Sequence, residues 1–247
     1  MIPPLLEEIF STRTVYDKDG NAYPLHSETP IDQIEFLISL LKQIGARRCL
    51  EIGLAYGIST IATCDAISGF GNRVMYSIDP DQIKWRDIGL KNIDDAGFSP
   101  FVRFFREPSA KVLSRLQDEA VVLDFVYIDS TKIFDILHTD VFYCTKLLRK
   151  GGLLVLDDCG IPGPHKLARY LLKMPHWRIY ASHGAGTLNW KRRLATSAAK
   201  LMPGGIRTKL LSPALSDPET ERRINGRCIA FQKLSEDERR WDWFADF

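Results

Sequence analysis

From residue 31 onward, the sequence alternates between short apolar segments and longer segments with apolar residues at helical spacing. The short segments predict β-strands and the longer ones α-helices. Strands that alternate with helices predict an α/β fold with a parallel sheet, right-handed crossovers and helices on both faces. The predicted helices are 31–45, 58–69, 81–97, 108–117, 133–148 and 164–173, and the predicted strands are 48–53, 73–79, 101–105, 121–129, 152–158, 176–181 and 227–234.

Acidic residues stand at the ends of four predicted strands. Glu51, Asp79 and Asp129 each end one strand, and the pair Asp157 and Asp158 ends another. Ligands of parallel α/β sheets bind outside the carboxyl ends of the strands. We therefore expect these acids to share one rim and to form a site there. The alternative is that they serve as helix caps or as solvated loop residues.

The turn after the first of these strands, in CLEIGLAYGIST (49–60), contains Gly53 and Gly57 and predicts a ligand-binding turn. It lacks the G-x-G-x-x-G of dinucleotide sites, and Glu51 would repel a pyrophosphate. A cationic ligand would suit Glu51, and Asp79 would accept hydrogen bonds from ribose hydroxyls. S-adenosylmethionine has a ribose, a positive group and no phosphate. The alternatives are a tight turn without a ligand and, for Asp79, a helix N-cap before Pro80.

With these motifs, the chain resembles the class I S-adenosylmethionine-dependent methyltransferases. Within that class it is similar to the cation-dependent small-molecule O-methyltransferases of the catechol type and of the sugar and natural-product type. The segments LEIGLAYGIST, YSIDPD and LLRKGGLLVLDD carry the resemblance, which covers roughly residues 25–181 and the strand 227–234. It implies a Rossmann-like seven-stranded sheet that is mostly parallel and whose last strand is antiparallel.

The resemblance also implies a set of cofactor-binding residues. Those in the glycine turn would line the amino acid end of the cofactor, the acid of YSIDPD would bind the ribose, and the EPSA stretch (107–110) would lie beside the adenine. The implied set is Glu51, Gly53, Tyr56, Gly57, Ser59, Asp79, Glu107, Ser109 and Asp129.

Three of the acids predict a metal site. Asp129, Asp157 and Asp158 follow two strands that we expect to be neighbours, and such carboxylates stay ionised together only when a cation neutralises them. Oxygen ligands favour Mg²⁺, Ca²⁺ or Mn²⁺ over zinc. The metal would bind the hydroxyl of an acceptor and lower its pKa, which agrees with the metal triad that the resemblance implies.

Two residues beside these acids are candidates for the catalytic base, with Asp129 completing the catalytic set. Lys132 follows Asp129 by three residues, as the proton-accepting lysine does in the catechol-type enzymes that the chain resembles. A metal and a sulfonium nearby would lower its pKa. Ser130 and Thr131 depart from the D-G-x-H and D-G-D patterns of the sugar-type relatives, so an exposed lysine at a helix start stays an alternative. His165, in a Pro-Gly-Pro-His turn, is the second candidate.

The sequence predicts one methyltransferase domain over 31–247, with an N-terminal extension at 1–30 and a basic insertion at about 184–223. The extension is expected to be extended, as a cover for the site or an irregular arm. Residues 161–247 contain 16 Lys and Arg against 8 Asp and Glu. This charge favours an acceptor that is anionic or tethered to an acidic carrier protein, and a solvated surface is the alternative. The aromatic C-terminus would pack on the body or on a second subunit of a homodimer.

Other classes fit less well. No basic patch with interleaved aromatics indicates nucleic acid, and the apolar runs are too short for a membrane span. Five cysteines without a CxxC pair and an N-terminus without a signal-peptide pattern favour the cytoplasm. The favoured function is metal-assisted O-methylation of a sugar, phenol or natural product. The alternatives are a metal-independent N- or macromolecule methyltransferase, an NAD(P)-dependent oxidoreductase and an idle cofactor-binding module.

Overall fold

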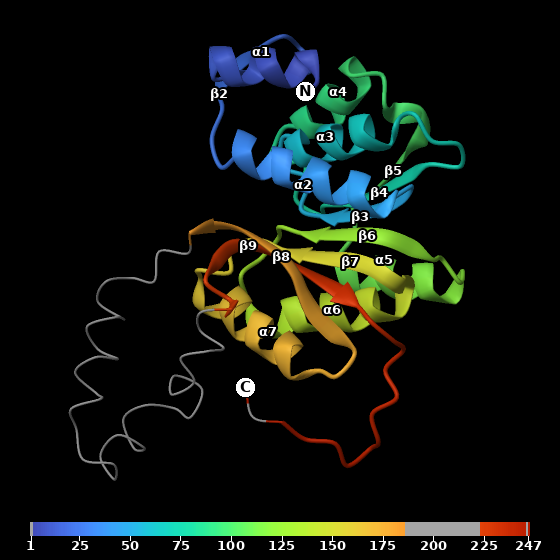
Figure 1. Cartoon of the computed structure of the whole chain (residues 1–247). Helices are drawn as coiled ribbons and strands as arrows, with labels where there is room; N and C mark the ends of the chain where they lie inside the picture. Colours follow the sequence, from blue (N-terminus) through green and yellow to red (C-terminus); the bar gives the residue numbers. More distant parts are fainter. Residues whose placement is uncertain (1, 186–222, 246) are drawn as a thin grey trace, which may run out of the picture.

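The computed structural model of the chain, which describes residues 2–185, 223–245 and 247, is built around a seven-stranded sheet (Figure 1). The strand order is β5-β4-β3-β6-β7-β9-β8. Strand β9 runs antiparallel to β7 and β8, and the other neighbours pair in parallel, so the predicted fold class is confirmed. The strands are β3 (Arg48–Ile52), β4 (Val74–Ile78), β5 (Val102–Phe105), β6 (Leu123–Ile128), β7 (Leu148–Leu156), β8 (Trp177–Ala185) and β9 (Gly226–Lys233).

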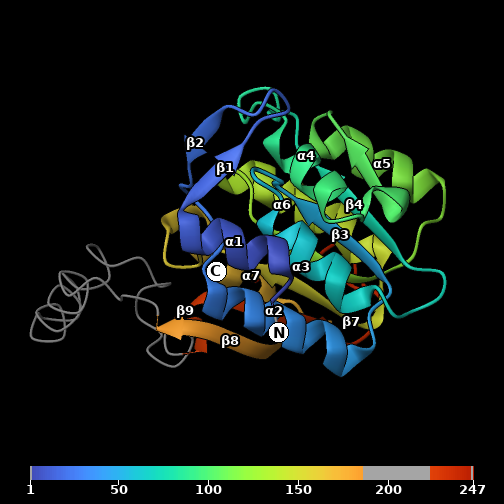
Figure 2. The same ribbon diagram turned by 90° about the horizontal axis from the view of Figure 1, so that it is seen from above.

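Helices cover both faces of the sheet, as Figures 1 and 2 show from two directions. One layer contains α2 (Ile31–Ile44), α3 (Ile58–Ile67) and α4 (Ile88–Asp95). The other contains α5 (Ser109–Asp118), α6 (Phe134–Leu147) and α7 (Pro162–Lys173). Two-sided burial explains why the strands are apolar throughout.

Residues alternate between the two layers along each strand. In β6, Val126 and Ile128 pack in the cluster beneath α5, α6 and α7, whereas Phe125 and Tyr127 pack in the cluster beneath α2 and α3. Side chains of a strand point alternately to opposite faces. The alternation therefore sends the side chain of Tyr127 towards the α2 layer.

The predicted helix 81–97 is wrong in its first half. Residues 80–87 form turns, Arg86 and Asp87 have φ values of 56° and 56°, and α4 begins only at Ile88. Non-glycine residues with positive φ cannot continue a right-handed helix. Asp79 is consequently not the N-cap of that helix.

The N-terminal residues are more ordered than the extended arm that the sequence suggested. They form α1 (Pro4–Thr12) and a hairpin of β1 (Thr14–Tyr16) and β2 (Ala22–Pro24). Residues 25–30, called the N-terminal strap below, connect the hairpin to α2. Leu6 and Ile9 of α1 are buried in one apolar cluster with Ile34 and Ile61. Burial of these side chains fixes the N-terminal unit against α2 and α3.

The remaining short element is the 3₁₀ turn η1 (Ser99–Phe101) before β5. Within residues 2–185 and 223–245, none of the helices is both long and apolar enough to cross a bilayer. Most of the predicted basic insertion, residues 186–222, lies outside the described part of the chain.

Candidate active site

A cavity of about 720 Å³ opens at the carboxyl edge of the sheet. Its wall is formed by the segments that follow β3, β4, β5, β6 and β7, and by residues 27–29 of the N-terminal strap. This is the position at which parallel α/β sheets bind ligands, and the volume is in the range of small-molecule sites.

In the glycine turn after β3, the backbone of Gly53 lies very close to the backbone of Asp129. Gly53 has a φ of +103°, and a Cβ there would lie 2.0 Å from the carbonyl oxygen of Asp129. On the other side of the same loop, a Cβ on Gly163 would lie 2.0 Å from the carbonyl oxygen of Lys132. Two glycines thus let β3 and α7 close on the segment 129–132, which carries candidate catalytic residues. Gly57, at a φ of +78°, precedes α3 but is not among the described residues of the cavity wall.

Asp79 fastens the glycine turn to the end of β4. Its Oδ2 accepts hydrogen bonds from the amides of Leu54 (3.2 Å) and Ala55 (3.0 Å) and from Nε2 of Gln82 (2.8 Å). Its Oδ1 accepts one, from the amide of Asp81 at 2.8 Å. Asp79 lines the cavity, and a carboxylate oxygen with one donor can still accept a bond from a ligand hydroxyl.

Glu51 lies behind the wall. It is fully buried, the hydroxyls of Ser59 and Thr60 donate hydrogen bonds to its two oxygens, and Ser59 rather than Glu51 contributes to the cavity surface. Burial raises the pKa of Glu51 to about 8, only partly offset by the two hydroxyls. In this structure the carboxylate of Glu51 therefore does not reach the described cavity surface, and its role towards a cationic ligand stays a prediction.

This raised pKa predicts a pH effect on stability. The folded chain keeps the Glu51 proton between the ordinary pKa of 4.5 and about 8, where the unfolded chain has lost it. The free energy of unfolding should therefore fall as pH rises through this window, by several kcal/mol because one pKa unit corresponds to about 1.4 kcal/mol. Urea denaturation of wild-type and Glu51→Gln protein across the window measures the difference. Identical pH profiles of the two proteins would contradict the burial effect.

The predicted acid trio is brought together. One carboxylate oxygen from each of Asp129, Asp157 and Asp158 lies within 4.8 Å of the others, and all three residues line the cavity. Asp157 is buried, whereas the other two are partly exposed. Burial, reinforced by the charge of Asp129, raises the pKa of Asp157 to about 6.

Among the described residues, two cationic side chains face the trio. Nζ of Lys132 lies 2.9 Å from Oδ1 of Asp129 and 3.0 Å from Oδ2 of Asp158. Nε of Arg227 lies 3.8 Å from Asp157 and 3.7 Å from Asp158. Burial opposes the charge on Lys132, but the two acids outweigh it and raise its pKa. The sequence analysis expected a metal and a sulfonium to lower the pKa of Lys132, whereas these two acids act in the opposite direction.

A buried hydrogen-bond chain supports the trio from the α2 side. Nε2 of Gln33 donates to the hydroxyl of Tyr127 at 2.9 Å, and that hydroxyl donates to Oδ2 of Asp157 at 3.0 Å. Burial and the nearby acids raise the pKa of Tyr127 well above its ordinary value, so the hydroxyl keeps its proton. The period of two in the strand places Tyr127 on the same side as Asp129, a signal that the sequence analysis did not use.

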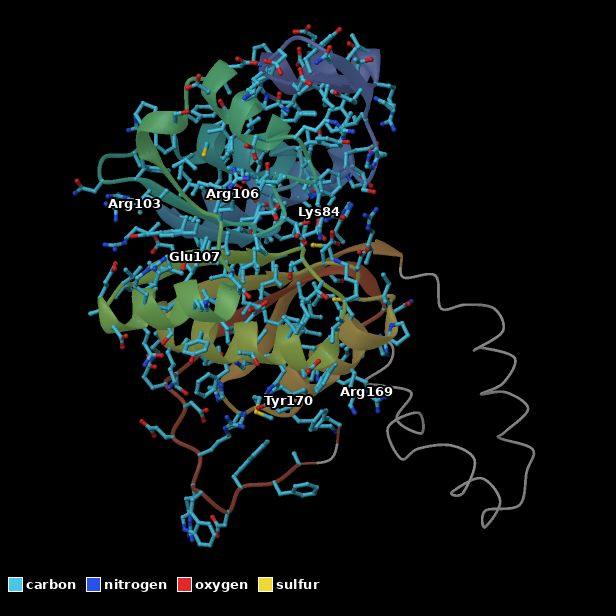
Figure 3. The ribbon with its side chains drawn as sticks, turned by 180° about the vertical axis from the view of Figure 1, so that it is seen from behind. Lys84, Arg103, Arg106, Glu107, Arg169 and Tyr170 are labelled. Carbon is cyan, nitrogen blue, oxygen red and sulfur yellow. The ribbon has the colours of Figure 1, made fainter. Side chains whose placement is uncertain are left out.

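Of the remaining predicted site residues, some line the cavity and others lie outside its described wall. Tyr56 and Ser109 line the cavity, and Tyr56 packs edge-on against Trp85, another wall residue, at 5.0 Å. Glu107, labelled in Figure 3, precedes α5. It pairs with Arg115 of α5 at 2.8 Å and is not among the described residues of the cavity wall. His165 is buried in α7, where Nδ1 contacts the carbonyl oxygen of Cys159 at 3.0 Å, so the structure does not bring it to the described cavity wall.

Comparisons with known proteins agree with this fold. The sequence model of the O-methyltransferase family matches residues 8–163. A caffeoyl-CoA O-methyltransferase of Populus kitakamiensis is 30% identical over 132 residues, and a flavonoid 3',5'-methyltransferase of Vitis vinifera is 29% identical over 132 residues. Each match covers 52% of this chain and 54% of the relative, so the chain spans little more than half the length of these relatives.

Two solved structures share the fold. An O-methyltransferase of Bacillus cereus in complex with SAH superposes with a TM-score of 0.60 at 23% identity, covering 74% of this chain and 85% of that one. An O-methyltransferase of Streptomyces achromogenes involved in tomaymycin synthesis, in complex with SAM, gives a TM-score of 0.60 at 16% identity, covering 84% and 82%. At these identities the two structures show the shared fold. The family model matches more than half of the residues of this chain, and the chain therefore belongs to the O-methyltransferase family.

Proposed function

We propose that this chain transfers the methyl group of S-adenosylmethionine to a hydroxyl of a small molecule, assisted by a divalent cation. The observation that carries the proposal is that the acid trio, the glycine turn and Asp79 line one cavity. Membership of the O-methyltransferase family supports the reaction class. The fold neighbours that bind SAH and SAM support the choice of cofactor.

The cavity fits a sulfonium nucleoside. At Gly53 the backbone faces the cavity without a side chain, and Asp79 next to it offers an acceptor to ribose hydroxyls. We assign Tyr56 and Ser59 to the same binding surface, because both line the cavity beside the turn. Holding the donor in one orientation relative to the acceptor is a large part of catalysis in a transfer reaction.

The trio fits a hard cation. Asp129, Asp157 and Asp158 would hold it, since carboxylate oxygens are the ligands that Mg²⁺, Ca²⁺ and Mn²⁺ prefer. The bound cation would supply Lewis acidity that lowers the pKa of the acceptor hydroxyl. The Gln33–Tyr127 chain would keep Asp157 oriented, because the tyrosine hydroxyl can donate to Oδ2 while the amide of Asp158 donates to Oδ1 at 2.7 Å.

Lys132 has two candidate roles. Its ammonium bridges Asp129 and Asp158, so it holds the carboxylates in place and offsets their repulsion. To accept a proton from the acceptor it must first lose its own, and its raised pKa opposes this. We therefore propose that Lys132 positions the acids in the resting protein, and that it acts as a base only when bound positive charge lowers its pKa.

We propose a phenolic acceptor in preference to a sugar. The support is that the relatives are named for caffeoyl-CoA and flavonoid substrates and that Tyr56 and Trp85 give the cavity aromatic surface. An anionic or carrier-tethered acceptor remains a proposal that rests on the basic insertion, most of which lies outside the described residues. A lid role for residues 27–29 is a proposal supported by their place in the cavity wall.

Metal removal tests the proposal. With S-adenosylmethionine and caffeoyl-CoA as probes, formation of S-adenosylhomocysteine should stop in excess EDTA and return when Mg²⁺ is restored, because the acid trio alone lacks the Lewis acid. Activity that persists in EDTA would instead support a metal-independent methyltransferase. A thermal shift with NAD but none with S-adenosylhomocysteine would contradict the choice of cofactor.

A further inference from the structure

Arg227 places a cationic side chain beside the acid trio. It is the second residue of β9, it lines the cavity, and its side chain is 42% exposed. Its Nε lies 3.8 Å from Oδ1 of Asp157 and 3.7 Å from Oδ1 of Asp158. These distances exceed those of hydrogen bonds, and a guanidinium has five N–H donors. Arg227 can therefore pair with the acids by charge and still donate hydrogen bonds to a ligand in the cavity.

The backbone of Arg227 is fixed to the loop that carries the acid pair. Its carbonyl oxygen accepts a hydrogen bond of 2.7 Å from the amide of Cys159, the residue that follows the pair. On the neighbouring strand β8, a Cβ at Gly184 would lie 3.0 Å from the Cβ of Arg227. The absence of a side chain at Gly184 therefore leaves room for the side chain of Arg227 beside the acids.

The charges of the cavity wall are unevenly distributed. Among its described residues, Lys132 and Arg227 are the two cations, and both lie at the acid trio. The acidic residues of the wall are Glu28, Asp79, Asp81, Asp129, Asp140, Asp157 and Asp158. Lys132 is already in close contact with two carboxylates, at 2.9 Å and 3.0 Å. A negatively charged group of a ligand is therefore favoured at the trio, where Arg227 can meet it, and repelled along the rest of the described wall.

The charges at the trio favour a deprotonated acceptor, in a step that rests on the proposed function. Three ionised carboxylates, two cationic side chains and one divalent cation leave a net charge of +1. A single deprotonated hydroxyl neutralises this charge. Positive charge within a few ångströms favours the ionised form of an acid. Without Arg227 the same set of groups would be neutral before the acceptor lost its proton.

The strand order places Arg227 on the side of the acids from which the acceptor must come. The residues proposed to bind the nucleoside follow β3 and β4, the acids follow β6 and β7, and Arg227 stands beyond them on β9. In methyl transfer the acceptor oxygen, its proton already released to water, bonds to the methyl carbon opposite the sulfur. The C–S bond breaks, and the sulfur leaves as a neutral thioether. This alignment puts the acceptor on the side away from the nucleoside, towards β9.

We infer that Arg227 binds the deprotonated oxygen of the acceptor, and that it thereby selects acidic hydroxyls, such as those of phenols, over aliphatic alcohols. The competing explanation is an ion pair that only holds Asp157 and Asp158 in place. An ion pair with that role affects the fold and the binding of a cation. It leaves the ionisation of a bound phenol unchanged, so the two explanations differ in a measurable property.

The ionisation of bound 4-nitrocatechol tests the inference, because this phenol changes colour when it loses its proton. Its absorbance is titrated against pH with S-adenosylhomocysteine and saturating Mg²⁺ present, so that no turnover occurs. In Arg227→Met the ionisation constant of the bound phenol should be about tenfold smaller than in wild type, because an adjacent cation is lost. Arg227→Lys keeps the charge and should lie between the two. Arg48→Met, an exposed position at the opposite edge of the sheet, should match wild type.

The outcomes separate the inference from the proposed function. An unchanged ionisation constant in Arg227→Met would overturn the role of Arg227 and leave the proposed function intact. Failure of the wild-type protein to bind 4-nitrocatechol would contradict the proposed function itself, and the inference with it. Affinity for S-adenosylhomocysteine within about threefold of wild type shows that a variant is folded. Should Arg227→Met lose this affinity, Arg227→Gln, which keeps a donor without the charge, carries the same expectation.

Discussion

Replacing Asp157 by alanine is expected to reduce methyl transfer by about a thousandfold or more, while affinity for S-adenosylhomocysteine stays within about threefold of wild type. The variant removes the buried member of the acid trio, and with it a proposed metal ligand, but leaves Gly53 and Asp79 in place. Because burial disfavours the charged form of Asp157, the loss of this carboxylate should not unfold the chain. Initial rates at saturating Mg²⁺ and calorimetric titration of the nucleoside measure the two effects.

Asp135→Ala is the matched control, because it removes an exposed carboxylate of α6 outside the described cavity wall. It should keep wild-type turnover. Asp157→Asn should lie between the two, since an amide oxygen is a weaker, neutral ligand for Mg²⁺. Normal turnover in Asp157→Ala would rule out the metal-assisted mechanism.

Gly53→Ala should lower the free energy of unfolding by about 3 kcal/mol or more and abolish nucleoside binding. The φ of +103° disfavours any side chain, and the added Cβ would lie 2.0 Å from the carbonyl oxygen of Asp129. A backbone atom cannot rotate away, so the ends of β3 and β6 must separate. Chemical denaturation and calorimetric titration of S-adenosylhomocysteine measure both effects.

Gly97→Ala separates backbone strain from this clash. Gly97 has a similar positive φ of +76°, but an added Cβ would meet nothing within 4 Å. The control should cost about 1 kcal/mol and leave ligand binding unchanged. Equal losses of stability in the two variants would mean that the clash with the carbonyl oxygen of Asp129 is not the reason why position 53 requires glycine.

The sequence predicts the sheet because its strands are buried on both faces and separated by amphipathic helices. It also predicts that Asp129, Asp157 and Asp158 meet, since carboxyl ends of neighbouring parallel strands share an edge. It misses α1, a helix of nine residues, and it misses the β1–β2 hairpin, whose strands of three residues have too few positions for a periodic signal. The turns at 80–87 were missed for a related reason: positive φ at Arg86 is not encoded by a glycine.

At the site, sequence reasoning identifies which acids end the strands but not what they face. Glu51 was expected to meet a ligand, yet the hydroxyls of Ser59 and Thr60 turn back to it. That contact depends on how α3 is oriented over β3. Asp140 did leave a signal, as a polar residue among the buried positions of α6. Only the structure shows that it is among the residues that line a cavity.

The antiparallel direction of β9 has a consequence for the acid trio. Because β9 runs against its neighbours, the end of β8 at Ala185 and the start of β9 at Gly226 pair with each other. Arg227, next along β9, reaches Asp157 and Asp158. A one-residue shift in the pairing of β9 would turn its side chains to the opposite face of the sheet, and would therefore remove this cationic side chain from the two acids.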